Sequence, residues 1–169
     1  YAIGEKAPSI HPKAFIHPDA VIIGDVRIGE LASVWPTAVL RGDSSYISIG
    51  ARTSIQDGAI IHCTSDLPTT IGDDCTVGHN AHLEGCTVMD SALIGSGALV
   101  LHEVVVESHA LVAAGAVCTA GLNVPENALA VGVPARIKEG AADQLTIEYS
   151  QRTYVANAQK YPTEMRLIQ

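Results

Sequence analysis

Aliphatic residues recur at every sixth position along most of this chain. The series runs through residues 10–40, 49–61, 71–83 and 88–130, and its members are Ile10, Ile16, Ile22, Ile28, Val34, Leu40, Ile49, Ile55, Ile61, Ile71, Val77, Leu83, Val88, Ile94, Val100, Val106, Val112, Cys118, Val124 and Ala130. A glycine often follows the aliphatic residue, and a small residue often stands four positions after it. A period of six fits neither an amphipathic helix nor an alternating strand.

This hexad pattern predicts a parallel β-helix, an all-β solenoid. A short strand turns a corner every six residues, three sides make one coil, and each repeated aliphatic side chain stacks on its equivalent one coil away. Corners favour glycine and small residues because backbones pass close together there. We place about seven coils in residues 1–137 and a C-terminal α-helix, packed on the β-helix, in residues 138–169.

The C-terminal helix is expected because the hexads stop after Pro134 and apolar residues then follow at roughly helical spacing. We expect it to span about residues 139–158 and to end before Pro162, since the residue preceding a proline is biased away from helix. A seam against the β-helix or a second subunit is indicated by three tyrosines, Tyr149, Tyr154 and Tyr161.

Two breaks in the ladder add residues to a side. Leu40 and Ile49 are nine positions apart, and Ile61 and Ile71 are ten apart. Insertions in a solenoid are extruded as surface loops, often on the binding face. We therefore expect a surface loop around residues 63–70.

Polar residues fall into columns once this register is fixed. Counting sides puts Arg41, His62 and Glu84 in one outer column, with a spacing of about 4.8 Å, and it stacks Asp57 under His79 on a different face. Faces of one prism point apart, so His62 and His79 converge only where two chains pack side by side. We therefore expect a homotrimer whose site takes His62 and Glu84 from one chain and His79 from the next.

A simpler interpretation exists for each of these residues. An outward polar residue on a β-helix is usually a solvated surface residue. Arg41 and Asp43 could pair across a corner, and Gln56 with Asp57 could cap a turn. However, two faces carry columns of histidine and carboxylate residues at the same coil level. This coincidence favours a functional site over isolated surface residues.

Composition and charge exclude several classes of partner. The chain has 10 basic and 18 acidic residues, a net charge of -8, and 4% aromatic residues. Repulsion from phosphate backbones and the lack of stacking side chains argue against nucleic acid. No long apolar stretch or signal-peptide pattern is present, so we expect no membrane association and a cytoplasmic location. The four cysteines lack Cys-x-x-Cys spacing, and we expect them to be reduced core residues.

Several motifs resemble those of the gamma-class carbonic anhydrase family and cover nearly the whole chain. They are Ser33-Val34-Trp35, Arg41-Gly42-Asp43, Ser54-Ile55-Gln56-Asp57 with His62 five residues on, Val77-Gly78-His79, Leu83-Glu84-Gly85-Cys86 and Val131-Gly132-Val133-Pro134-Ala135. The resemblance implies a left-handed trimeric β-helix. It also implies Zn²⁺, or another divalent ion such as Fe²⁺ or Co²⁺, held by three histidines at the subunit interface.

Carried over position by position, the resemblance implies His62 and His79 as metal ligands, and the third ligand position holds Glu84. This glutamate departs from the family, although two histidines with one glutamate are a known zinc ligand set. Two alternatives stay open. Either His82 or His102 supplies the third ligand, or no metal is held tightly.

The resemblance also implies supporting roles around the metal. Arg41, Asp43 and Asp57 would fix the ligands and the subunit interface, and Gln56 would orient the nucleophile. Ser44 stands where the most active members carry a proton-shuttling glutamate. An anionic ligand in place of a neutral histidine should make bound water less acidic.

Three functions follow as hypotheses. The first is a carbonic anhydrase-like lyase that hydrates carbon dioxide, a small-molecule substrate, to bicarbonate. The second is an acyl-CoA thioesterase or an acyltransferase of the hexapeptide type, which the segment from Gly132 to Ala135 resembles but the acidic charge disfavours. The third is a catalytically silent trimeric scaffold, which the glutamate at the third ligand position favours.

Overall fold

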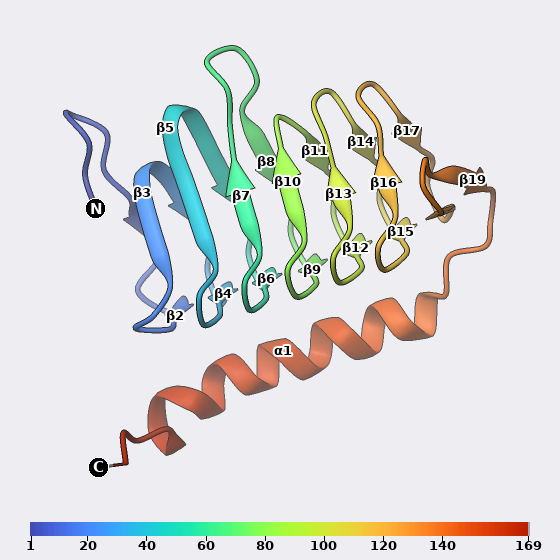
Figure 1. Cartoon of the computed structure of the whole chain (residues 1–169). Helices are drawn as coiled ribbons and strands as arrows, with labels where there is room; N and C mark the ends of the chain where they lie inside the picture. Colours follow the sequence, from blue (N-terminus) through green and yellow to red (C-terminus); the bar gives the residue numbers. More distant parts are fainter. Residues whose placement is uncertain (169) are drawn as a thin grey trace.

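The computed structural model describes residues 1–168 as a left-handed parallel β-helix of about seven coils with one α-helix along its outside (Figure 1). Strands of successive coils pair in parallel, and the inward side chains form one continuous core along the solenoid. The helix α1 (Gln144–Glu164) runs back along the stack, so the C-terminal end of the chain lies near the first coils (Figure 1).

The strands form three faces. The first face contains the starts of two long strands and four short strands: β3 (Val21–Ile28), β5 (Val39–Ile49), β7 (Ile60–His62), β10 (His82–Glu84), β13 (Leu99–Val100) and β16 (Val117–Cys118). The second face contains the ends of β3 and β5 together with β1 (Ser9–Ile10), β8 (Thr69–Ile71), β11 (Thr87–Val88), β14 (Val105–Val106) and β17 (Asn123–Val124). The third face contains β2 (Phe15–Ile16), β4 (Ser33–Val34), β6 (Ser54–Ile55), β9 (Thr76–Val77), β12 (Leu93–Ile94), β15 (Leu111–Val112) and β18 (Leu129–Val131). A last strand, β19 (Arg136–Lys138), pairs antiparallel with β18 at the final coil.

The repeated aliphatic residues stack in the core as the hexad count predicts. Leu40 pairs with Ile61, and Ile61 pairs with Leu83, on three successive coils of the first face. All three side chains are fully buried. The first member of the series, Ile10, is 41% exposed because its coil is the end of the stack. The ladder therefore sets the register of every outward side chain next to it.

The two insertions have different outcomes. Residues 63–68 form a loop between β7 and β8, which rises above the coils in Figure 1. The extra residues between Leu40 and Ile49 form no loop, because β5 is one continuous strand that bends round a corner. It pairs with β7 through residues 39–41 and with β8 through residues 47–49. Backbone pairing on both faces keeps these residues in the sheet.

The C-terminal helix begins and ends later than the sequence predicts, since α1 spans Gln144–Glu164 rather than about residues 139–158. Its N-terminus is capped by Asp143, whose carboxylate accepts hydrogen bonds from the backbone N–H groups of Leu145 and Thr146. The expected end before Pro162 is wrong, because α1 continues to Glu164 with this proline inside. A proline in the last turn removes only one backbone hydrogen bond, and packing of the preceding Tyr161 holds this end of the helix in place.

An aromatic seam joins α1 to the third face. The indole ring of Trp35 lies 5.2 Å from the ring of Phe15, 5.4 Å from that of Tyr154 and 4.9 Å from that of Tyr161, measured between centroids. Two of the three helix tyrosines thus form the expected seam against the β-helix. The third, Tyr149, points outward and is 73% exposed.

The four cysteines are buried and unpaired, in agreement with their expected role as core residues. Burial raises the pKa of the thiols of Cys75 and Cys86 to about 12, so both are inert at neutral pH. Within residues 1–168, no helix is both long and apolar enough to span a membrane.

Replacing Ile61 by alanine should lower the free energy of unfolding by about 2 to 5 kcal/mol, because a fully buried aliphatic side chain is lost and leaves a cavity. The neighbouring Ile60 points outward and is 45% exposed, so Ile60→Ala serves as a control that should cost much less. Denaturant unfolding of both variants measures the difference. Equal losses would contradict the assigned register.

Candidate functional site

One group of predicted residues lies on the first face, where three strands place them in a row. The register pairs Arg41 with His62 and His62 with Glu84, on β5, β7 and β10. The imidazole Nδ1 of His62 lies 2.7 Å from Oε1 of Glu84, and its Nε2 lies 3.1 Å from Oδ1 of Asp43. A neutral imidazole carries a single N–H, so it donates to only one of these two carboxylates at a time.

Asp43 contacts both Arg41 and His62. Its Oδ2 accepts a hydrogen bond from Nη1 of Arg41, and its Oδ1 faces the His62 ring. Burial acts to raise the pKa of Asp43, but hydrogen bonds from Arg41 and His62 outweigh burial and lower this pKa to about 2. The carboxylate therefore stays ionised and holds the His62 side chain against the first face.

Glu84 lies among three imidazoles. Besides His62, Nε2 of His82 lies 3.6 Å and Nε2 of His102 lies 3.7 Å from Oε2 of Glu84. The hydrogen bond with His62 outweighs burial and lowers the pKa of Glu84, with smaller contributions from His102 and His82. Nε2 of His102 is buried and has no hydrogen-bond partner in the described part of the chain.

A glycine allows this crowding. Gly85 has a φ of +62°, and a Cβ there would lie 2.9 Å from Cδ2 of His102 and 3.0 Å from Cβ of Leu67. Leu67 belongs to the loop between β7 and β8. A side chain at position 85 would therefore push His102 and this loop away from Glu84.

The second group lies at the corner that follows the third face. β6 and β9 pair so that Asp57 stacks next to His79. Oδ2 of Asp57 lies 2.9 Å from Nδ1 of His79, and the hydroxyl oxygen of Tyr154 lies 3.3 Å from Nε2 of the same ring. The side chains of Asp57 and His79 are each 45% exposed in the single chain. Gln56, next to Asp57 in the chain, is almost fully buried at 4% exposure.

Tyr154 is the residue at this corner that the sequence did not assign to the site. The cluster of tyrosines in the C-terminal segment indicated a contact, but only the docked helix shows that one of them reaches His79. The predicted residues thus form two groups on different parts of the prism, and their role as a site stays a prediction.

A single chain does not bring these donors together round one point. Among residues 1–168, no three histidine, cysteine, aspartate or glutamate side chains are arranged to hold a metal ion. The three imidazoles of the first group gather round the carboxylate of Glu84 itself. The residue types nevertheless fit zinc, because imidazole and carboxylate are its usual ligands and a carboxylate on the far nitrogen of a metal-binding histidine is its usual support. Asp57 gives His79 that support.

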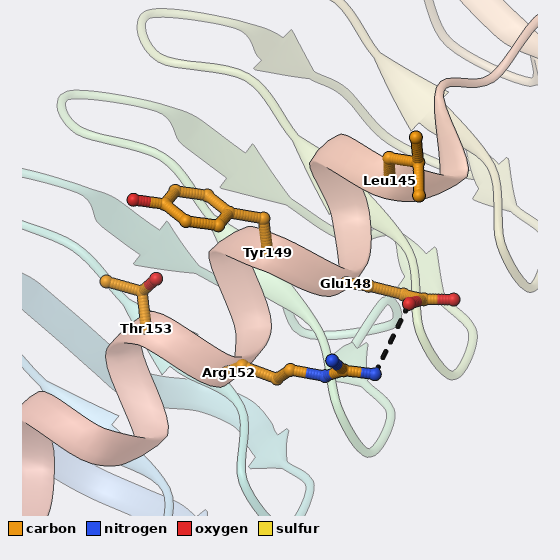
Figure 2. Close-up of a pocket in the computed structure, with 5 residues that line it drawn as sticks. All are labelled: Leu145, Glu148, Tyr149, Arg152 and Thr153. Atoms are coloured by element: carbon orange, nitrogen blue, oxygen red, sulfur yellow. Dashed lines mark hydrogen bonds and ion pairs between the residues drawn. The ribbon is translucent and has the colours of Figure 1, made fainter.

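A surface hollow lies elsewhere on the molecule. It has a volume of about 530 Å³ and follows the outer side of α1, where Figure 2 shows Leu145, Glu148, Tyr149, Arg152 and Thr153 lining it. An ion pair of 3.4 Å joins Arg152 to Glu148 across one side of this hollow (Figure 2). None of the predicted site residues lines this hollow.

Comparison with known proteins gives one matching family description, bacterial transferase hexapeptide (six repeats), over residues 7–42. Gamma carbonic anhydrase 2 of Arabidopsis thaliana, a mitochondrial protein, is 40% identical over 95% of this chain. The chain spans 60% of that relative's length. The carnitine operon protein CaiE of Escherichia coli is 37% identical over 85% of this chain and 73% of its own length.

A solved structure is also similar. The putative acetyltransferase of Bacillus cereus superimposes with a TM-score of 0.94 at 36% identity, and the match covers 98% of this chain and 97% of that one. The coil stack and the C-terminal helix are thus shared with a protein described as a putative acetyltransferase.

The Arg41–Asp43 contact can be tested by titration. Arg41→Ala should raise the pKa of Asp43 from about 2 toward its ordinary value of 3.8, as the guanidinium hydrogen bond and charge are lost. A carboxyl group whose pKa is lower in the folded chain than in the unfolded chain stabilises the fold at pH values above its unfolded pKa. This stabilisation is lost as the pH falls toward the pKa of the folded chain. The stability difference between parent and variant should therefore shrink between about pH 4 and pH 2.

Carbon-13 NMR of the Asp43 carboxyl group measures the pKa, and acid unfolding measures the stability. Arg27→Ala is the matched control, because Arg27 pairs with Asp25 on another face and leaves Asp43 alone. An unchanged Asp43 pKa in Arg41→Ala would contradict the electrostatic assignment.

Proposed function

The chain belongs to the hexapeptide-repeat family that includes the gamma carbonic anhydrases, and on this basis we propose that it is a metal-dependent, carbonic anhydrase-like lyase that hydrates carbon dioxide to bicarbonate. The observation that carries the proposal is the pair of groups described above. His62 and Glu84 lie within hydrogen-bond distance on one face, and His79 is held by Asp57 at another corner. This separation supports a site that is shared between chains.

A homotrimer would bring the two groups of side chains from different chains close together. Closed threefold packing repeats one interface three times, so each first face meets the His79 corner of a neighbour. In this assembly His62 and Glu84 of one chain and His79 of the next would hold Zn²⁺ or another divalent ion such as Fe²⁺ or Co²⁺. The bound ion would supply an activated water as the nucleophile for carbon dioxide.

The surrounding residues of this chain orient the ligands. Asp57 fixes the ring of His79 through Nδ1, so Nε2 is the nitrogen that would bind the metal. Asp43, fixed by Arg41, holds the ring of His62. Gln56 follows β6 and has a buried side chain, and it would help to orient the nucleophile. Carbon dioxide is small and uncharged, so the site needs no basic patch.

A second candidate function is acyl-group chemistry, which the similarity to the Bacillus cereus putative acetyltransferase favours. The net charge of -8 disfavours binding of the coenzyme A phosphates. Calorimetric titration with coenzyme A separates the two functions, since a carbonic anhydrase-like protein should show no saturable heat. Saturable binding together with thioester turnover would favour the acyl function.

The shared site predicts complementation between two inactive variants. His62→Ala and His79→Ala trimers should each lack a complete site, because every interface loses one ligand. Mixed trimers should regain some complete sites, since an intact His62 can meet an intact His79. Co-expression with two tags, followed by metal analysis and a stopped-flow hydration assay, measures the rescue. A monomer in sedimentation that keeps stoichiometric metal would rule out sharing.

The identity of the third ligand predicts a pH effect. If Glu84 is a ligand, its negative charge raises the pKa of the bound water, so hydration should be weak at neutral pH and rise in alkali. Glu84→His should shift the pH–rate profile to lower pH, and Glu84→Ala should weaken metal binding by more than about tenfold.

His82→Ala and His102→Ala are the comparison variants for this assignment. Both should keep the metal if Glu84 is the ligand. Metal that survives in Glu84→Ala but is lost from either histidine variant would transfer the assignment to that histidine. Parent protein without metal or hydration activity would leave the silent scaffold as the better description.

A further inference from the structure

One contact joins the C-terminal helix to the proposed site. The hydroxyl oxygen of Tyr154 on α1 lies 3.3 Å from Nε2 of His79, and the two rings meet at 64° with centroids 6.4 Å apart. The residues are 75 positions apart in the chain. The contact therefore exists only because the helix docks on the third face.

The protons on His79 are ordered by its other neighbour. A carboxylate can only accept hydrogen bonds, so Asp57 requires the N–H of His79 to be at Nδ1. In the neutral imidazole Nε2 then carries the lone pair, and the O–H of Tyr154 donates to it. A phenol is protonated at neutral pH, so Tyr154 has a proton to donate.

The same lone pair is what a metal needs. A zinc–nitrogen bond of about 2.0 to 2.1 Å uses the lone pair directly, and a hydrogen-bond donor on that nitrogen excludes it. The other nitrogen of the ring is already held by Asp57. We propose that Tyr154 is a gating residue whose hydroxyl closes Nε2 of His79 in the metal-free protein and must release it before the metal binds.

This inference rests on the proposed metal-dependent function. It adds a residue from outside the β-helix to the metal site and gives α1 a role in loading. Release of the hydroxyl requires the phenol ring or α1 to move away from Nε2 of His79, and α1 buries only Ile147 and Ala158 among its described residues. The Tyr154 ring is held separately by its edge contact with Trp35, at 78° and 5.4 Å between centroids.

The test removes the hydroxyl and keeps the ring. Tyr154→Phe preserves the contact with Trp35 and loses the hydrogen bond to His79. Tyr161→Phe is the matched control, because Tyr161 packs against Trp35 at 4.9 Å between centroids, whereas the aromatic partner of His79 within residues 1–168 is Tyr154. Sedimentation and circular dichroism of the full-length trimers check that all three proteins fold alike.

Two measurements test whether the Tyr154 hydroxyl blocks Nε2 of His79. In metal-free protein, the nitrogen-15 resonance of His79 Nε2 should move toward that of an unbonded imidazole nitrogen in Tyr154→Phe and stay unchanged in Tyr161→Phe. In calorimetric titration with Zn²⁺ alone, Tyr154→Phe should bind about two- to tenfold more tightly than the parent, the effect of one neutral hydrogen bond. Tyr161→Phe should bind as the parent does.

The outcomes separate the gate from the function. Equal or weaker zinc binding by Tyr154→Phe, in proteins that all bind zinc, would overturn the gate and leave the metal site standing. An unchanged Nε2 resonance would also overturn the gate, since the hydroxyl would not be on that nitrogen in solution. Absence of zinc binding in the parent and both variants would overturn the proposed function together with the gate.

Discussion

Stacking of one inward aliphatic side chain on its equivalent in the next coil is the interaction on which the rest of this molecule depends. The contact between Ile61 and its neighbours Leu40 and Leu83 is completely dry, and it fixes which residues of β5, β7 and β10 point outward. A slip of one residue would turn His62 into the core. The positions of the polar groups are therefore a consequence of the apolar ladder.

The same ladder separates the candidate ligands. Successive sides of a coil face different directions. In the proposed trimer, the column on the first face and the His79 corner would therefore contact different neighbours. His62 with Glu84, and His79 with Asp57, are each complete as local pairs. The proposed chemistry then depends on assembly. In the proposed trimer, subunit association and site formation would be one event.

Glu84 places a negative charge in the candidate site. Its carboxylate lies among the rings of His62, His82 and His102, where it can accept hydrogen bonds, and its lowered pKa keeps it ionised. A negative charge at this position attracts a cation and at the same time reduces the acidity of any water on that cation. In the proposed metal site, this arrangement would favour metal retention over fast hydration at neutral pH.

The sequence determined the coils, the number of turns and the row formed by Arg41, His62 and Glu84, because a strict period of six converts position in the chain directly into position in space. The period of six predicts nothing about segments that do not follow the repeat. The continuity of β5 and the extension of α1 past Pro162 depend on backbone pairing and on packing against Trp35. The hydroxyl of Tyr154 on His79 was likewise decided by the docked helix alone, since no repeat relates a helix residue to a coil 75 positions earlier.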